Sequence, residues 1–155
     1  MIDIDALVSE KITEKLDTSF EVTPDGEYIA TISDRGPVKD WFRTVSTKNG
    51  DQPQCNILFV INDPEVAKKL GRNQATSRLT LWLDTELDNS GKVRIATGKG
   101  KNVSLGQLRA ALNQDSDTSW SFDKLLGAGP VRITTQTSEG KSGGKFSNVT
   151  RVAKL

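Results

Sequence analysis

Residues 131–155 read VRITTQTSEGKSGGKFSNVTRVAKL and place two strand-like runs around a loop of glycine, serine and lysine. We expect strands over 131–137 and 146–155, because both runs are rich in β-branched residues and the loop has the composition of a turn. Gly140-Lys141-Ser142 ends like a Walker A phosphate loop, but that motif needs a glycine where Thr135 stands and a helix directly afterwards. The stretch therefore predicts a terminal hairpin with a basic tip and argues against a nucleoside triphosphate site.

Apolar residues at helical spacing precede this hairpin and predict a helix. Leu105, Leu108 and Leu112 share one face of a helix for which Ser104 is the expected N-cap. A second short helix is expected over 122–126, ended by Gly127. Further upstream, alternating or continuous apolar runs predict strands over 28–33, 41–46, 55–61 and 78–83.

This order of elements predicts a mainly β fold in a single domain, residues 1–155. Three main strands, a helix and two more strands match an OB-fold-like five-stranded barrel, which we place at 20–155 with a helical insert at about 104–127. A generic α+β sandwich with the same elements is the alternative. An amphipathic N-terminal helix is expected over 1–18 and is predicted to pack on the domain, with an oligomer contact as the other role; its apolar positions are Ile4, Leu7 or Val8, Ile12 and Leu16.

Composition limits the chemistry. The chain has one cysteine, Cys55, and no histidine, which excludes Ser-His and Cys-His catalysis and any zinc site that needs imidazole. Cys55 shares a strand face with Ile57 and Phe59, which predicts that it is a buried apolar residue. We expect a cytoplasmic protein without a membrane span, because no apolar run approaches about 20 residues and the first residues lack a signal pattern.

Charge is unevenly distributed along the chain. Residues 1–34 carry nine acids and two lysines, whereas residues 35–155 carry 19 bases and 11 acids. This split indicates a basic working surface on the body of the domain, although a dipole without function has the same signature.

Two glycine-rich basic loops are candidate phosphate contacts. One is Gly98-Lys99-Gly100-Lys101-Asn102, and the other carries Lys141 and Lys145 at the tip of the terminal hairpin. In OB-folds the loop between the last two strands flanks the oligonucleotide groove. The alternative is that exposed tips simply favour Gly, Ser and Lys.

Two tryptophans are candidates for stacking on bases. In the run 78–83, Leu79, Leu81 and Leu83 form the apolar face, so Trp82 lies on the polar face with Arg78. Coverage of Trp82 by the N-terminal helix is the alternative. Trp41 shares a face with Arg43 and is the second stacking candidate, whereas Trp120 and Phe122 are interpreted as packing residues.

Asp84, Glu86 and Asp88 alternate and would share one face if the strand continues. Such a row can hold Mg²⁺ in a nuclease. A solvated strand end that leads into a turn is the simpler interpretation.

SLGQLRAAL, FDKLLGAGPVRI and the final KFSNVTRVAKL resemble small single-stranded DNA-binding proteins encoded by bacteriophages, over roughly residues 54–155. The resemblance implies an OB-fold, sequence-independent binding of single strands, and a role in phage DNA replication or recombination. The chain departs from many such proteins because it ends Arg151-Val152-Ala153-Lys154-Leu155, without an acidic tail.

We therefore expect a non-enzymatic protein that binds single-stranded DNA in the bacterial host cytoplasm, needs no cofactor or metal, and works beside replication or recombination proteins. Homo-oligomer formation is left open. The rivals are a phage accessory protein that binds a host protein through Trp41 or the N-terminal helix, and a metal-dependent nuclease. The residues expected to bind DNA are Trp41, Arg43, Arg78, Trp82, Lys99, Lys101, Lys141 and Lys145.

Overall fold

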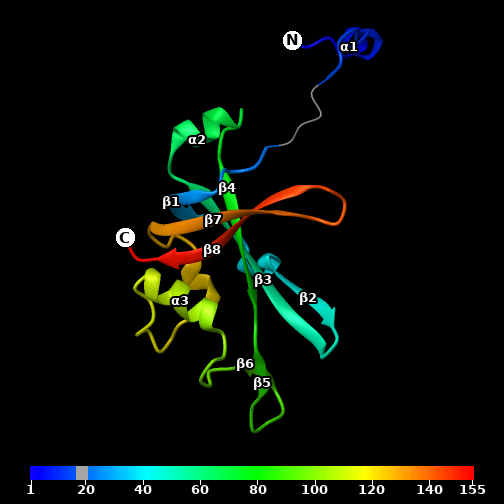
Figure 1. Cartoon of the computed structure of the whole chain (residues 1–155). Helices are drawn as coiled ribbons and strands as arrows, with labels where there is room; N and C mark the ends of the chain where they lie inside the picture. The colour runs from blue at the N-terminus through cyan, green and yellow to red at the C-terminus, as the bar shows by residue number, and fades with distance from the viewer. Residues whose placement is uncertain (17–20) are drawn as a thin grey trace.

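The fold is a closed β-barrel carrying helices (Figure 1), seen in a computed structural model that describes residues 1–16 and 21–155. Within this described part, five strands form a ring in the order β1–β7–β8–β4–β3, and the ring closes because β1 pairs with both β7 and β3. Neighbours in the ring are antiparallel except β4 and β8. The strands are β1 Gly26–Ile32, β3 Gly50–Ile61, β4 Thr76–Trp82, β7 Val131–Glu139 and β8 Lys145–Ala153.

This architecture confirms the mainly β, OB-fold-like barrel with a helical insert before its last two strands. The core is filled by alternate residues of the ring strands, among them Ile57, Phe59, Leu81 and Ile133, which are fully or almost fully buried. Inward and outward residues alternate because successive side chains of a strand point to opposite faces.

The helical insert consists of α3 (Val103–Ala111) and a 3₁₀ turn, η2 (Phe122–Leu125). Leu105, Leu108 and Ala111 bury the inner face of α3 against the barrel. The prediction of Ser104 as N-cap is wrong: the N-cap is Asn102, two residues earlier, and its backbone is left-handed with φ 51°. The second expected helix is a 3₁₀ turn, followed by Gly127 in the left-handed region. A further short helix, α2 (Pro64–Lys69), links β3 to β4.

The N-terminal helix is shorter than expected and does not pack on the barrel. α1 spans Ile4–Ser9, none of its residues is buried, and residues 10–16 are exposed and not helical. Residues 17 and 18 of the expected helix lie outside the described residues. Of the apolar positions that predicted this helix, Ile12 and Leu16 lie outside it. A helix gains most of its stability from a packing partner, and no residue of α1 is buried.

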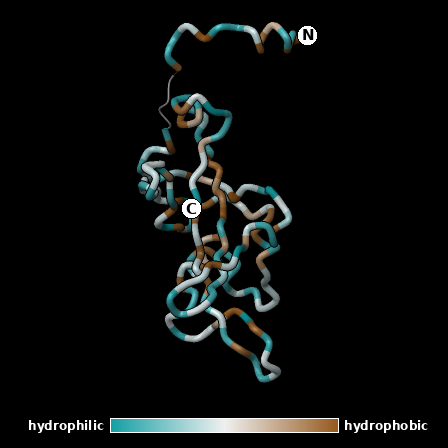
Figure 2. Tube along the Cα trace, turned by 90° about the vertical axis from the view of Figure 1, so that its right-hand side faces the viewer, coloured by the Kyte–Doolittle hydropathy of each residue, from teal (hydrophilic) through white to brown (hydrophobic). Residues whose placement is uncertain are grey.

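Two hairpin arms extend from the barrel (Figure 1). In the first, β2 (Phe42–Thr47) pairs with the initial half of β3. In the second, β5 (Thr85–Leu87) pairs with β6 (Val93–Ile95). Figure 2 shows hydrophobic stretches on this second arm as well as in the barrel, and Leu87 and Val93 of the arm are exposed.

The structure contradicts Trp41 as a stacking residue. Strand β2 begins at Phe42, and Trp41 belongs to a 3₁₀ turn, η1 (Val38–Trp41), that follows Pro37. Val38 and Trp41 lie three residues apart on the same side of this turn and are both buried. Trp41 is 4% exposed, and its indole Nε1 donates a hydrogen bond to the Arg35 carbonyl at 2.7 Å. Its ring therefore belongs to the core.

Candidate nucleic-acid interface

Strands β3 and β4 present a polar outer surface, here called the β3–β4 face. The register places Leu58 opposite Arg78 and Asn56 opposite Thr80, while the alternate residues point into the core. From Thr76 to Trp82 the face is about 20 Å long, at about 3.3 Å per residue. Its side chains are Asn56, Leu58, Val60, Thr76, Arg78, Thr80 and Trp82.

Arg43 and Trp82 belong to one row across this sheet. Arg43 of β2 and Trp82 of β4 are both register partners of Gln54 in β3, so their Cα atoms lie about 10 Å apart. Trp82 is 47% exposed, which confirms that its ring is open to solvent. The N-terminal helix does not cover it. The predicted placement of Trp82 and Arg78 on one face is therefore confirmed. Arg43, which was expected to share a face with Trp41, lies instead in the row of Trp82.

A hydrogen-bonded chain fixes the polar side chains between these residues. The Oε1 atom of buried Gln54 accepts hydrogen bonds from Arg43 Nε at 2.6 Å and from Asn56 Nδ2 at 3.0 Å. Thr80 Oγ1 donates to Asn56 Oδ1 at 2.9 Å. Sequence reasoning missed this network, because Gln54 stands beside an apolar run and carries no motif. The hydrogen bond from Arg43 to Gln54 holds the Arg43 side chain in the row that also contains Trp82.

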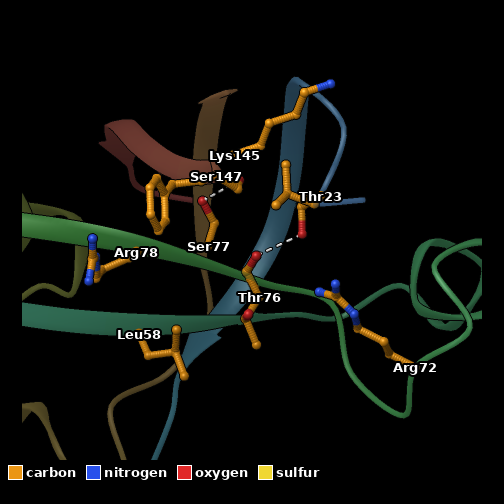
Figure 3. Close-up of a pocket in the computed structure, with 10 residues that line it drawn as sticks. Thr23, Leu58, Arg72, Thr76, Ser77, Arg78, Lys145 and Ser147 are labelled. Atoms are coloured by element: carbon orange, nitrogen blue, oxygen red, sulfur yellow. Dashed lines mark hydrogen bonds between the residues drawn. The ribbon is translucent and has the colours of Figure 1, made fainter. Parts of the chain in front are cut away.

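A basic cavity of about 270 Å³ opens where β4 and β8 diverge, and Figure 3 shows its lining. Arg72, Arg78 and Lys145 border it from three separate segments, and Leu58 of β3 also lines it. Two hydrogen bonds tie the walls together: Thr23 Oγ1 to the Thr76 carbonyl at 2.7 Å, and Ser77 Oγ to Ser147 Oγ at 2.8 Å. The structure thus brings Arg78 and Lys145, both predicted site residues, to one cavity.

Phe146 is an aromatic residue of this cavity that sequence reasoning missed. Its side chain is 46% exposed and lines the cavity beside Lys145. The ring lies so close to the turn that a Cβ added at Gly140 would be 2.8 Å from Phe146 Cε2. The turn is closed by hydrogen bonds between Gly140 and Gly144 and between Gly143 and Gly140. The available sequence signal was that Phe146 shares a strand face with the polar Asn148, which indicates a solvent-facing ring.

The other end of the β3–β4 face borders a second cleft of about 230 Å³, lined by Trp82, Gly100 and the start of α3. Lys99 and Lys101 stand on either side of Gly100 and are exposed. Asn102 holds this corner together: its Oδ1 accepts from the Asp84 amide at 2.8 Å, and its Nδ2 donates to the carbonyls of Asp84 and Ala96. The predicted basic loop is therefore positioned next to Trp82.

The cations predicted to bind DNA form no ion pair with a described acidic side chain. Within residues 1–16 and 21–155 the ion pairs are Glu86–Arg94 and Asp117–Lys124, so neither involves a predicted site residue. Lys141 is exposed at the hairpin tip, but it lines neither cavity. Of the six predicted cations, Arg43 is held by the neutral Gln54, and none has an acidic partner among the described residues. The five not bonded to Gln54 are Arg78, Lys99, Lys101, Lys141 and Lys145.

The three acids considered for a metal have other roles. Asp84 Oδ2 accepts from the Asn102 amide at 3.0 Å, and Glu86 pairs with Arg94 at 2.9 Å. Asp88 Oδ1 accepts from Ser90 and from the Lys92 amide, and these hydrogen bonds hold the pKa of Asp88 below its ordinary value. No group of three or more potential metal-ligating side chains occurs in the described part of the chain. The interpretation as a strand end leading into a turn fits these contacts.

Cys55 is fully buried, as predicted, and burial raises the pKa of its thiol to about 12. The thiol therefore stays protonated at neutral pH and is a poor nucleophile. Trp120 and Phe122 are packing residues, also as predicted: their ring centroids are 5.0 Å apart, and Phe122 makes an edge contact with Phe42.

A scan against protein-family models and a search of curated proteins gave no match to this chain. Among the described residues, the helices are all too short or too polar to span a bilayer.

Proposed function

We propose that this protein binds single-stranded DNA without sequence preference and is not an enzyme. The observation that carries the proposal is the half-exposed ring of Trp82, on a face that ends at two clefts. Arg78 and Lys145 line the first cleft, Lys99 and Lys101 stand on either side of Gly100 of the second, and none of these four forms an ion pair with a described acid. In OB-fold barrels, oligonucleotides bind to the outer face of the second and third strands and to the loop between the fourth and fifth. In this chain those parts are the β3–β4 face and the β7–β8 turn.

The physical basis is a combination of stacking and phosphate neutralisation. Trp82 and Phe146 offer exposed rings near the two ends of the face, and a base stacked on an aromatic ring contributes about 1–3 kcal/mol. Arg78 and Lys145 at one end, and Lys99 and Lys101 at the other, would contact phosphates. Because every base has a flat face and every nucleotide a phosphate, this set favours no particular sequence.

The resemblance to bacteriophage single-stranded DNA-binding proteins supports the same proposal and extends it to a role in DNA replication or recombination in the bacterial cytoplasm. Replication or recombination proteins would then be its partners. Neither the stacking nor the phosphate contacts require a metal or cofactor.

The test is a titration of labelled oligo-dT, followed by fluorescence anisotropy at low salt, beside a duplex of the same length. We expect saturable binding to oligo-dT and weaker binding to the duplex. No binding to oligo-dT at low salt refutes the proposal. Incubation of the same DNA with Mg²⁺ tests the nuclease rival, for which we expect no cleavage.

A second candidate function, binding to a host protein, is favoured by the exposed apolar side chains of the N-terminal segment, including Ile4 and Leu7. The Trp41 surface no longer supports it, because that ring is buried. The oligo-dT titration separates the two candidates, since a protein-binding factor need not respond to nucleic acid.

A further inference from the structure

Strand β8 has a free edge along its second half. β7 pairs with β8 from Lys145 to Ala153, whereas β4 pairs with it only at Asn148 within the described residues. Among the described residues, no main-chain hydrogen bond joins residues 150–153 to β4 or to α3. α3 lies alongside this half of β8 (Figure 1). An unpaired edge of this kind is a template for an added strand.

A groove follows this edge. It has a volume of about 600 Å³ and is lined by Gln107, Ala110 and Ala111 of α3 and by residues 150–154. A groove over the face of a strand touches alternate residues, because neighbouring side chains point to opposite sides. This groove touches five residues in a row, so it runs along the strand edge. The small side chains of the two alanines leave room for a further segment.

The lining is basic. It contains Arg151 and Lys154 and no acidic residue. Both side chains are exposed, and neither forms an ion pair within the described residues. The groove therefore fits an extended peptide that is apolar on one side and acidic on the other.

The chain itself contains such a peptide near its start. In extended form, Ile2, Ile4, Ala6 and Val8 fall on one side, and the other side carries Asp3 and Asp5 together with Leu7. Ile2, Ile4 and Val8 are 72%, 63% and 80% exposed. Within this stretch, α1 has only six residues, and it is held by local bonds such as that from the Ala6 amide to Asp3 Oδ1 at 3.1 Å. So short a helix is marginal in water, and its unwinding costs little.

We propose that residues 2–8 of a second copy of this chain lie as an added strand along the free edge of β8. The apolar side would face Ala110 and Ala111, and the acidic side would pair with Arg151 and Lys154. A second copy is favoured over the same copy because Arg72 binds the Glu21 carbonyl at 2.7 Å, beside α2. Figure 1 places α2 at the end of the barrel opposite α3. Reciprocal exchange of the two segments closes a symmetric dimer.

The test is the dimer dissociation constant, measured by sedimentation velocity over a concentration series. We expect the full chain to be a dimer at tens of micromolar, and deletion of residues 2–10 to raise the dissociation constant at least tenfold. The deletion removes no buried side chain, so its near-UV circular dichroism should match that of the full chain. Arg151→Glu with Lys154→Glu should have the same effect as the deletion.

The decisive arm is charge exchange. Asp3→Lys with Asp5→Lys should disrupt the dimer, and the four substitutions in one chain should restore it. Glu10→Lys with Glu14→Lys makes the same charge change outside the docking segment and should leave the dimer intact. A monomeric full chain, a dimer insensitive to the deletion, or a failure of the fourfold variant to recover overturns the proposal. DNA binding plays no part in these measurements.

Discussion

Replacement of Trp82 by alanine is the sharpest single test of the stacking surface. Trp82 is 47% exposed and faces solvent, so its removal should leave the barrel folded; surface substitutions usually change stability by no more than about 0.5 kcal/mol. Loss of one stacked base costs about 1–3 kcal/mol of binding. The dissociation constant for oligo-dT should therefore rise by about 5- to 150-fold, at a tenfold change per 1.4 kcal/mol.

Tryptophan fluorescence gives an independent readout of the same variant. Trp41 is buried and Trp120 is partly buried. Arg109 lies 4.8 Å from the Trp120 ring centroid, and Trp120 Nε1 donates a hydrogen bond to Gln114. Trp82 is the most exposed of the three tryptophans, so we expect quenching by DNA to disappear in Trp82→Ala.

Two further variants control this experiment. Trp82→Phe keeps an aromatic ring and should recover most of the affinity without the quenching, whereas Trp120→Phe should retain both. If Trp82→Ala loses less than twofold in affinity and is still quenched by DNA, the stacking surface has been placed on the wrong ring.

Three other predictions follow from single contacts. Gly140→Ala should displace the Phe146 ring, because the added Cβ would lie 2.8 Å from that ring. We expect oligo-dT binding to weaken several-fold while the barrel stays folded. If affinity is unchanged in both Gly140→Ala and Phe146→Ala, the Phe146 ring is not part of the interface. Hydrogen bonds lower the pKa of Asp88, so its ionised form stabilises the β5–β6 turn. This stabilisation is fully present at pH values above the ordinary aspartate pKa of about 3.9 and is lost as pH falls through the lower pKa of the folded state. Hydrogen exchange at the turn amides should accelerate in acid relative to the Asp88→Asn variant, and identical pH profiles contradict this. Cys55, with a thiol pKa of about 12, should react with Ellman's reagent only after denaturation, and rapid labelling of the native protein contradicts its burial.

The barrel was predictable because its strands carry strong local patterns. Alternation in the run from Cys55 to Ile61 and in that from Arg78 to Leu83 marks which side chains enter the core. The order of strands, helix and terminal hairpin then limits the topology. The exposed position of Trp82 followed from the same alternation, without knowledge of its neighbours.

The features that sequence reasoning missed depend on local geometry or on distant partners. Trp41 was assigned to a strand, but the turn after Pro37 delays that strand by one residue and directs the ring inward. The α1 helix was extended too far, since amphipathic spacing does not reveal whether a packing partner exists. Gln54 is buried by cross-strand neighbours that are 11 and 28 positions away in the chain, so no local pattern marks it.

The central claim is that cations at the two ends of the β3–β4 face neutralise the phosphates of a single strand. The most direct test is the slope of log affinity for oligo-dT against log salt concentration, which is about −0.7 for each phosphate neutralised on a single strand. The predicted cations other than Arg43, which is engaged by Gln54, are five in number and give a slope of about −3.5 at full engagement. Lys99→Gln with Lys101→Gln should reduce it to about −2.1.

The matched control is Lys124→Gln with Arg132→Gln, which removes two exposed charges outside the β3–β4 face and its loops. The account predicts a slope for this control equal to that of the full chain. Equal slopes for all three proteins, or an affinity for oligo-dT that does not respond to salt, contradict it.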